Sequence, residues 1–298
     1  MIPKAPIEPR IREALASEAS QAPGASEAPN ASDATPPSRK RGRLRRFRRL
    51  YGLSALFTLA LLGLWEAIIR GFHVPKYLLP APSQVAVALH QDWSAYLAPA
   101  MWVTLREVVF GFLIAAVTGV GLAIILHMSG PLRRTVYPLL IGSQTIPIVV
   151  LAPILVILLG YGIFPKLVIV TLICFFPIVV NGLDGLRSVD DDFIHMMRTL
   201  DANRWAIFKR IEFPAALPAI FSGLRIAATF AAIGAVFAEY AGASAGLGYV
   251  MIQATPNLQT ARIFAAILIL ILISFALFAL VSVLERIFVP WAPRGNAM

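Results

Sequence analysis

This chain of 298 residues has one cysteine, four histidines and only 14% charged residues, against roughly 25% in an average soluble domain. With Cys174 alone, it has no intrachain disulfide and no thiolate metal cluster. None of its five lysines follows a glycine, so the GxxxxGK phosphate-binding loop is missing. The histidines are scattered without metal-ligand spacing. These absences argue against an ordinary soluble enzyme. From them we predict that the chain has no catalytic residues, no cofactor of its own and no metal site.

The sequence does have long apolar runs, and 58% of its residues are hydrophobic. Crossing a bilayer takes about 20 apolar residues in a helix, and the runs lack the period of two that a barrel strand shows. We therefore predict an all-α membrane protein with six transmembrane helices. A turn at Gly160-Tyr161-Gly162 divides the longest run into two spans. The predicted spans are residues 51–69, 108–126, 136–159, 165–184, 218–239 and 263–284.

The net charge of +10 comes largely from one short run. Residues 39–49 hold eight of the 26 basic residues. We interpret this run as a topology anchor that binds anionic lipid headgroups, and not as a nucleic-acid site. Before it, the chain is rich in Pro, Ala and Ser and poor in large apolar side chains, which is typical of disorder. The predicted organisation is a disordered tail (1–48), a six-helix transmembrane domain (49–292) and a short C-terminal tail (293–298).

The distribution of Lys and Arg predicts the orientation. With the N-terminus in the cytoplasm, 20 basic residues lie in cytoplasmic segments, and six lie outside or within spans. Both termini are therefore expected in the cytoplasm. Residues 185–217 then form the longest cytoplasmic loop.

This loop has the pattern of two short helices. The first is predicted over about 191–200, and the second begins near Ala202 and ends before Pro214, because proline disfavours helix in the residue before it. Asp201 lies at the break. The aspartates at 190–192 lie at the start of the first helix, where carboxylates complement the helix dipole, and we do not assign them to a metal.

The second helix has a cluster of bulky apolar side chains with a basic rim. Trp205 and Phe208 share one face, and Arg204 and Lys209 lie beside them. Such a surface is typical of a protein-docking site, with Trp205 and Phe208 as anchors. The alternative is that these residues pack against the cytoplasmic ends of the spans.

The loop resembles the cytoplasmic motif of permease subunits of bacterial ABC importers. That motif reads Glu-Ala-Ala, three residues, Gly, nine residues, Ile, one residue, Leu-Pro. Here His195-Met196-Met197 takes the place of the triplet and Asp201 that of the glycine, while Ile211, Phe213 and Pro214 complete the pattern with its spacing kept. Asp tolerates the left-handed conformation better than most residues, so the turn at Asp201 is expected to survive. Because His195 stands where the motif has glutamate, the loop lacks an acidic side chain that the family would use to contact its partner ATPase.

The resemblance implies a fold, partners and a location. The fold would be that of a type I ABC importer permease in the bacterial inner membrane. The permease would act as a homodimer with two ABC ATPase subunits, which use the ATP, and with an extracytoplasmic substrate-binding protein. The loop would be the coupling helix that docks on the ATPase, through His195, Asp201, Ala202, Arg204, Trp205, Phe208, Lys209 and Pro214.

Within this family the chain resembles the nitrate, sulfonate and taurine group. Gln144-Thr145-Ile146-Pro147 and the segment from Asn181 to Arg187 resemble importers of thiamine pyrimidine precursors or riboflavin. Polar groups at membrane depth are candidates for a translocation pathway, and here these are Gln144, Thr145, Asn181 and Glu239. For Gln144 an interhelical hydrogen bond is the alternative, and for Asn181 a structural role. We expect Glu239 to line the outer gate or to contact the binding protein.

The predicted function is thus the permease subunit of an ATP-driven importer for a pyrimidine, a thiamine precursor or a related vitamin. The alternatives are a sulfonate, taurine or nitrate importer and an autonomous secondary transporter. At the outer boundary we expect Ser83 to cap an amphipathic helix, and Glu66 and Glu107 to be partly solvated.

Overall fold

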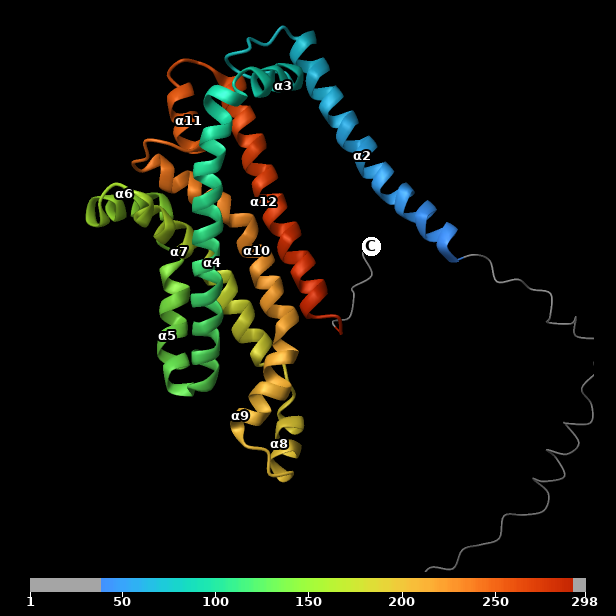
Figure 1. The fold of residues 1–298 in the computed structure, drawn as a ribbon, viewed down its shortest axis with the longest axis vertical. Helices are drawn as coiled ribbons and strands as arrows, with labels where there is room; N and C mark the ends of the chain where they lie inside the picture. Colours follow the sequence, from blue (N-terminus) through green and yellow to red (C-terminus); the bar gives the residue numbers. More distant parts are fainter. Residues whose placement is uncertain (1–38, 292–298) are drawn as a thin grey trace, which may run out of the picture. The chain divides into compact units, whose positions relative to one another are not determined.

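The computed structural model describes residues 39–291, which contain helices and turns but no strand (Figure 1). Two units are distinguished, residues 39–59 and residues 60–291. The first belongs to helix α2 (Arg39–Gly71), which covers the predicted span 51–69. Of the tail predicted at 1–48, residues 1–38 lie outside the described part of the chain. Its last ten residues are helical, because Arg, Lys and Leu are good helix formers. The predicted C-terminal tail also lies outside the described part.

Four described helical segments are long and apolar enough to cross a membrane, and a fifth span results if one bent pair of helices is counted together. These four agree with the predicted spans two, four, five and six, and α2 is not among them. The all-α membrane fold is therefore confirmed, and the count of six spans remains a prediction. The four segments are Trp93–Met128, Ile163–Leu186, Arg204–Tyr240 and Thr260–Phe288.

The bounds of the helices in the second unit show how each span is built. After α2, the short helices are α3 (Pro82–Gln91), α5 (Gly130–Ser143), α6 (Ile148–Leu159), α8 (Asp191–Thr199), α9 (Arg204–Ile207) and α11 (Leu247–Ala254). The long helices are α4 (Ala98–Met128), α7 (Ile163–Leu186), α10 (Phe213–Tyr240) and α12 (Thr260–Phe288). Two π-helical turns, η1 (Trp93–Leu97) and η2 (Phe208–Glu212), lead into α4 and α10.

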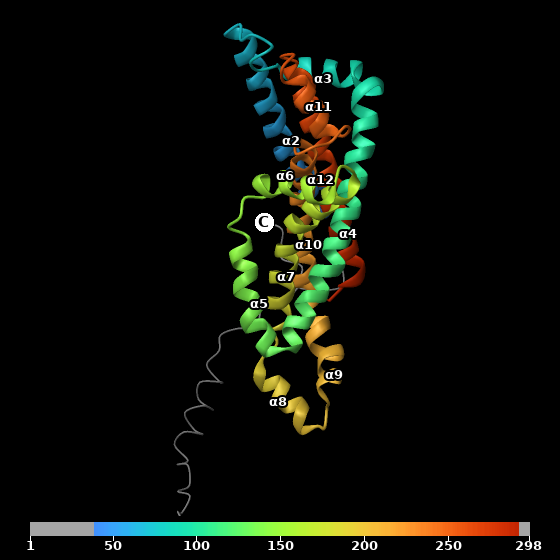
Figure 2. The ribbon, with the colours of Figure 1, turned by 90° about the vertical axis from the view of Figure 1, so that its left-hand side faces the viewer.

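The predicted span 136–159 is broken. Helices α5 and α6 meet at an angle of 100° around residues 144–147 (Figure 2). Pro147 precedes α6 in an extended conformation, and a proline disfavours helix in the residue before it, here Ile146. By contrast, the turn predicted between the third and fourth spans is present, with positive φ at Gly160 (82°) and Gly162 (155°).

Helices α4, α7 and α10 form the centre of the second unit, with α12 packed on α10. Small residues bring their backbones together. A Cβ atom added at Gly223 of α10 would lie 2.7 Å from the Pro177 carbonyl oxygen of α7, and one at Gly185 would lie 2.6 Å from Cβ of Ala219. Close approach through small residues is a common way to pack helices in lipid, where the hydrophobic effect contributes little.

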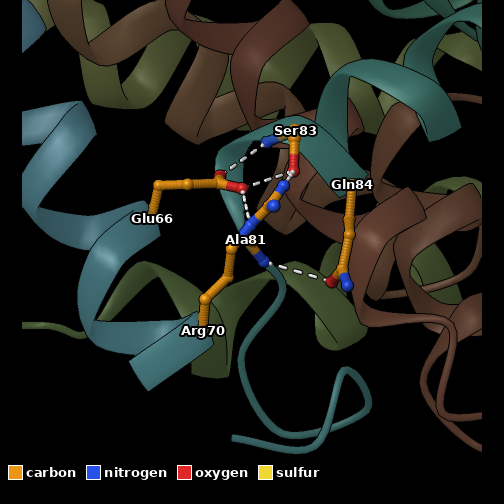
Figure 3. Close-up of polar contacts among 5 residues, drawn as sticks. All are labelled: Glu66, Arg70, Ala81, Ser83 and Gln84. Carbon is orange, nitrogen blue, oxygen red and sulfur yellow. Dashed lines mark hydrogen bonds and ion pairs between the residues drawn. The ribbon is translucent and has the colours of Figure 1, made fainter. Parts of the chain in front are cut away.

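Helix α3 is tied to the end of α2 by a carboxylate (Figure 3). The Glu66 side chain accepts hydrogen bonds from the Ser83 backbone N–H (3.1 Å) and hydroxyl (2.7 Å), and it pairs with Arg70 (2.6 Å). Gln84 accepts from the Ala81 N–H at 3.2 Å. The prediction that Ser83 caps α3 is therefore wrong: Ser83 lies in the first turn, and Glu66 satisfies its N–H.

Candidate functional site

The loop 185–217 contains two capped helices. Helix α8 begins after Asp190, whose carboxylate accepts from the Asp192 N–H at 2.9 Å, and α9 begins after Asn203, whose side chain accepts from the Ala206 N–H at 2.8 Å. Asp190 thus serves as a helix cap, and no group of three or more His, Cys, Asp or Glu side chains able to hold a metal is found among residues 39–291. The loop lies at the opposite end of the second unit from α3 (Figures 1 and 2).

Asp201 makes the turn between these two helices. Its φ is 60°, in the left-handed region that favours glycine and that Asp tolerates better than most residues. This is the conformation expected at the motif position where the family carries glycine.

Trp205 and Phe208 are placed differently. The Trp205 side chain is exposed, with 61% of its surface accessible, whereas Phe208 is buried at 6%. Their rings stack with centroids 5.3 Å apart, and Phe208 also contacts the rings of Phe213 and His127. For Phe208 the structure agrees with the alternative that this residue packs against the ends of the spans, and its ring supports that of Trp205.

The basic rim is only partly free. An Arg204 guanidinium nitrogen donates to the Met128 carbonyl oxygen at 2.8 Å, which satisfies the C-terminal end of α4. Lys209 is exposed, and so are His195 and Asp201. Ala202 is half-buried within the turn.

The second helix of the loop does not end before Pro214. It continues through η2 into α10, so that residues from Arg204 to Tyr240 form one helical segment. In η2 the hydrogen bonds are one residue wider, and the Phe213 N–H bonds to the Phe208 carbonyl. The wider turn accommodates the proline ring, which has no N–H and would clash with a carbonyl in a regular helix.

Below the loop, a buried hydrogen bond between side chains joins α4 to η2. His127 Nε2 and Glu212 Oε2 are 2.8 Å apart, and their side chains are 12% and 11% exposed. Sequence reasoning missed both residues: His127 looked like one scattered histidine, and Glu212 like one acidic residue in a basic loop. Proximity across 85 residues leaves no sign in sequence spacing.

At the end of α10 away from the loop, Glu239 is completely buried. It accepts from the Thr104 hydroxyl at 2.6 Å and from the Gly248 N–H, while Thr104 accepts from the Leu247 N–H at 2.8 Å. A gate-lining position predicted for Glu239 is therefore not what this structure has: the carboxylate fastens the loop before α11 to α4.

A buried ion pair lies beside Glu239. Lys166 Nζ of α7 donates to Glu107 Oε1 of α4 at 2.6 Å. The exposed fractions are 1% for Glu107 and 8% for Lys166, so the expectation of a partly solvated Glu107 is wrong. An ionisable side chain inside the predicted span 165–184 was the available signal.

The other pathway candidates are not brought together. Gln144 and Thr145 are exposed at the bend between α5 and α6, and Thr145 donates to the Gly142 carbonyl at 2.8 Å. Asn181 donates to the Pro177 carbonyl of its own helix at 2.8 Å, which fits the structural alternative. Arg225 pairs with Glu285 of α12.

These features define a multi-pass helical membrane protein with a capped helical loop at one end. A search of family models matches residues 108–292 to the family described as binding-protein-dependent transport system inner membrane component. The chain belongs to this family, and it is therefore a transport component of the inner membrane and not an enzyme. Membership implies an ABC ATPase and a substrate-binding protein as partners.

Named relatives cover most of the chain. It is 37% identical over 239 residues to the formylaminopyrimidine transport permease protein ThiX of Halalkalibacterium halodurans, covering 80% of this chain and 95% of that protein. It is 33% identical to the riboflavin transport system permease protein RibX of Chloroflexus aurantiacus, covering 78% and 87%. It is 27% identical to the taurine transport system permease protein TauC of Escherichia coli, covering 78% and 86%.

Among solved structures, an inward-facing MetNI methionine ABC transporter matches with a TM-score of 0.53 and 20% identity, covering 64% of this chain and 96% of that one. This likeness supports the predicted fold.

Proposed function

We propose that this chain is the permease subunit of an ATP-driven importer and that the loop 185–217 is its ATPase-docking surface. The observation that carries the proposal is Trp205, a large aromatic side chain held 61% exposed on a capped helix that continues into a span. An exposed aromatic backed by a buried one is a typical protein-docking anchor. The proposed docking surface also takes residues from the same loop, namely His195, Asp201, Ala202, Arg204, Lys209 and Pro214. ATP is used by the separate subunit.

The proposed assembly is a homodimer. Each chain has one docking loop, and closure of two ATPase subunits engages two loops. Both termini and the loop lie in the cytoplasm, as the distribution of basic residues predicts, and the segment around α3 and α11 faces the binding protein.

For the solute we propose a pyrimidine, a thiamine precursor or a related vitamin. Support comes from the relatives named for formylaminopyrimidine and riboflavin transport. A sulfonate, taurine or nitrate importer is the alternative, with lower identity to the taurine permease. Gln144 and Thr145, exposed at the bend of the broken span, are the pathway candidates that remain accessible. Uptake of labelled formylaminopyrimidine, compared with taurine, separates the two solute classes.

The docking surface is tested by co-purification. The tagged chain, extracted gently from its native membranes, is expected to carry a stoichiometric ATPase. Trp205→Ala should weaken this association by about 2 kcal/mol, or roughly 30-fold, because it truncates the anchor. Trp102→Ala is the matched control, since Trp102 is equally exposed, at 57%, near the outer end of α4.

Retention of the ATPase and of transport by Trp205→Ala would remove the docking assignment. Loss of the ATPase in both variants would instead indicate general damage to the protein.

A further inference from the structure

One helical segment connects the docking surface with the outer end of the protein. It runs for 37 residues from Arg204 to Tyr240. At 1.5 Å per residue it is about 55 Å long, against a hydrocarbon core of about 30 Å. The segment contains two buried carboxylates, Glu212 and Glu239, one near each end.

Both carboxylates bind the same neighbouring helix. Near the inner end, Glu212 pairs with His127, in the last turn of α4, at 2.8 Å. Near the outer end, Glu239 accepts from the hydroxyl of Thr104, also on α4, at 2.6 Å. Thr104 and Glu239 have no exposed surface, so water does not compete for this hydrogen bond.

The inner pair is in contact with the docking surface. Trp205 stacks on Phe208, and the Phe208 ring lies 6.3 Å from the His127 ring, measured between centroids. Trp205 is therefore connected to α4 through a buried ring, as well as along its own helix.

The outer pair is in contact with the loop before α11. Thr104 accepts from the Leu247 N–H, and Glu239 from the Gly248 N–H. A Cβ atom at Gly246 would lie 2.2 Å from the Glu239 carboxylate, so the loop backbone is pressed against this side chain.

Close packing leaves little room for sliding between these contacts. On α4, a Cβ atom added at Gly111 would lie 2.6 Å from Val170 of α7, and one at Gly234 of α10 would lie 3.2 Å from the same residue. By contrast, the Arg225–Glu285 pair joins the segment to α12 and not to α4.

We propose that His127 and Glu212 at the inner end, and Thr104 and Glu239 at the outer end, are positioning residues for transport. They fasten the segment Arg204–Tyr240 to α4, so that movement of the docking surface reaches residues 241–248 as one rigid displacement. This inference rests on the proposed function, because the ATPase supplies the movement.

The test follows both ends of the segment with spin labels. In a Cys174→Ala background, labels are placed at Arg210→Cys and, separately, at Ser244→Cys, both exposed positions. The complex of permease and ATPase is measured with and without ATP by electron paramagnetic resonance. In the parental protein we expect both labels to change mobility.

Glu212→Ala and Thr104→Val each remove one fastening. In both we expect the Arg210 label to respond to ATP and the Ser244 label to lose its response. Glu212→Gln keeps a hydrogen-bonding group for His127 and should restore the response. Glu285→Gln, which weakens the ion pair to α12 only, should leave it intact. Thr104→Val preserves side-chain shape and gives a second test if Glu212→Ala fails to fold.

The outcomes separate the two proposals. A Ser244 response that persists in both Glu212→Ala and Thr104→Val overturns this inference, as does a parental Ser244 label that stays silent while the Arg210 label responds. A parental protein in which neither label responds overturns the proposed function as well.

Discussion

At the scale of single residues, the packing of α7 against α10 depends on the absence of side chains. Gly223 lies under the Pro177 carbonyl, and a Cβ atom there would also come within 2.9 Å of Cβ of Asn181. Neither the carbonyl nor the Asn181 Cβ is the flexible end of a side chain. An added methyl group must therefore push the helices apart.

We expect Gly223→Ala to destabilise the protein by about 1–3 kcal/mol, the usual cost of overpacking. Gly121→Ala on α4 is the control, because a Cβ atom there has no neighbour within 4 Å. It should be neutral or stabilising by roughly 0.5–1 kcal/mol, since alanine favours helix over glycine. Thermal unfolding in detergent measures both, and equal midpoints would contradict the close approach.

Residue types predicted some positions and not others. Asp201 could be assigned a left-handed turn from the motif, because its position is a local property. Phe208 could not be distinguished from Trp205, because periodicity gives a shared face but not which ring meets solvent. The partners of Glu239, Glu107 and Glu212 could not be predicted either, since each lies on another helix.

At the scale of elements, the prolines differ in effect: Pro177 lies inside α7, whereas two others lie just after a π-helical turn. Pro214 and Pro99 each follow a five-residue π-helical turn, and both helices continue through them into a span. Pro147 has no such turn and breaks the chain by 100°. The sequence predicts spans well where apolar runs are uninterrupted, as in α7 (predicted 165–184). It fails at Pro147, because a proline is compatible with a break, with a widened turn or, as at Pro177, with a continuous helix.

The carboxylate that caps α3 gives a prediction at this scale. Glu66→Ala removes the acceptor for the Ser83 N–H and hydroxyl, so the first turn of α3 should fray and separate from α2. Hydrogen exchange of the Ser83 amide should then become faster. Glu66→Gln keeps one acceptor oxygen, so its Ser83 amide should exchange at a rate between those of the parental protein and Glu66→Ala. Unchanged exchange in Glu66→Ala would mean that α3 is held by its apolar face alone.

At the scale of the whole molecule, the second unit has the loop 185–217 at one end and α3 and α11 at the other (Figure 1). The proposed orientation places the first in the cytoplasm. The sequence predicts this orientation from the distribution of basic residues. It cannot predict the contacts that join the two ends, because those contacts are made between segments far apart in the chain.

Labelling with a membrane-impermeant thiol reagent tests the orientation. In a Cys174→Ala background, Ser244→Cys should react when the reagent is outside the cell, and Arg210→Cys should react only after the membrane is opened. The reverse pattern would place the loop 185–217 outside and would exclude docking to a cytoplasmic ATPase.

The buried pair of Lys166 and Glu107 has a consequence for biogenesis. If α7 entered the bilayer alone, the ammonium group of Lys166 would lack a partner. The cost is below the roughly 3 kcal/mol of a lysine at the centre of a span, because Lys166 is the fourth residue of α7. Glu107 on the earlier helix α4 supplies the counter-charge at 2.6 Å. Insertion of α7 is therefore coupled to the presence of α4. Once these two helices have met in the nascent chain, the charges of Lys166 and Glu107 compensate each other, before α10 is synthesised.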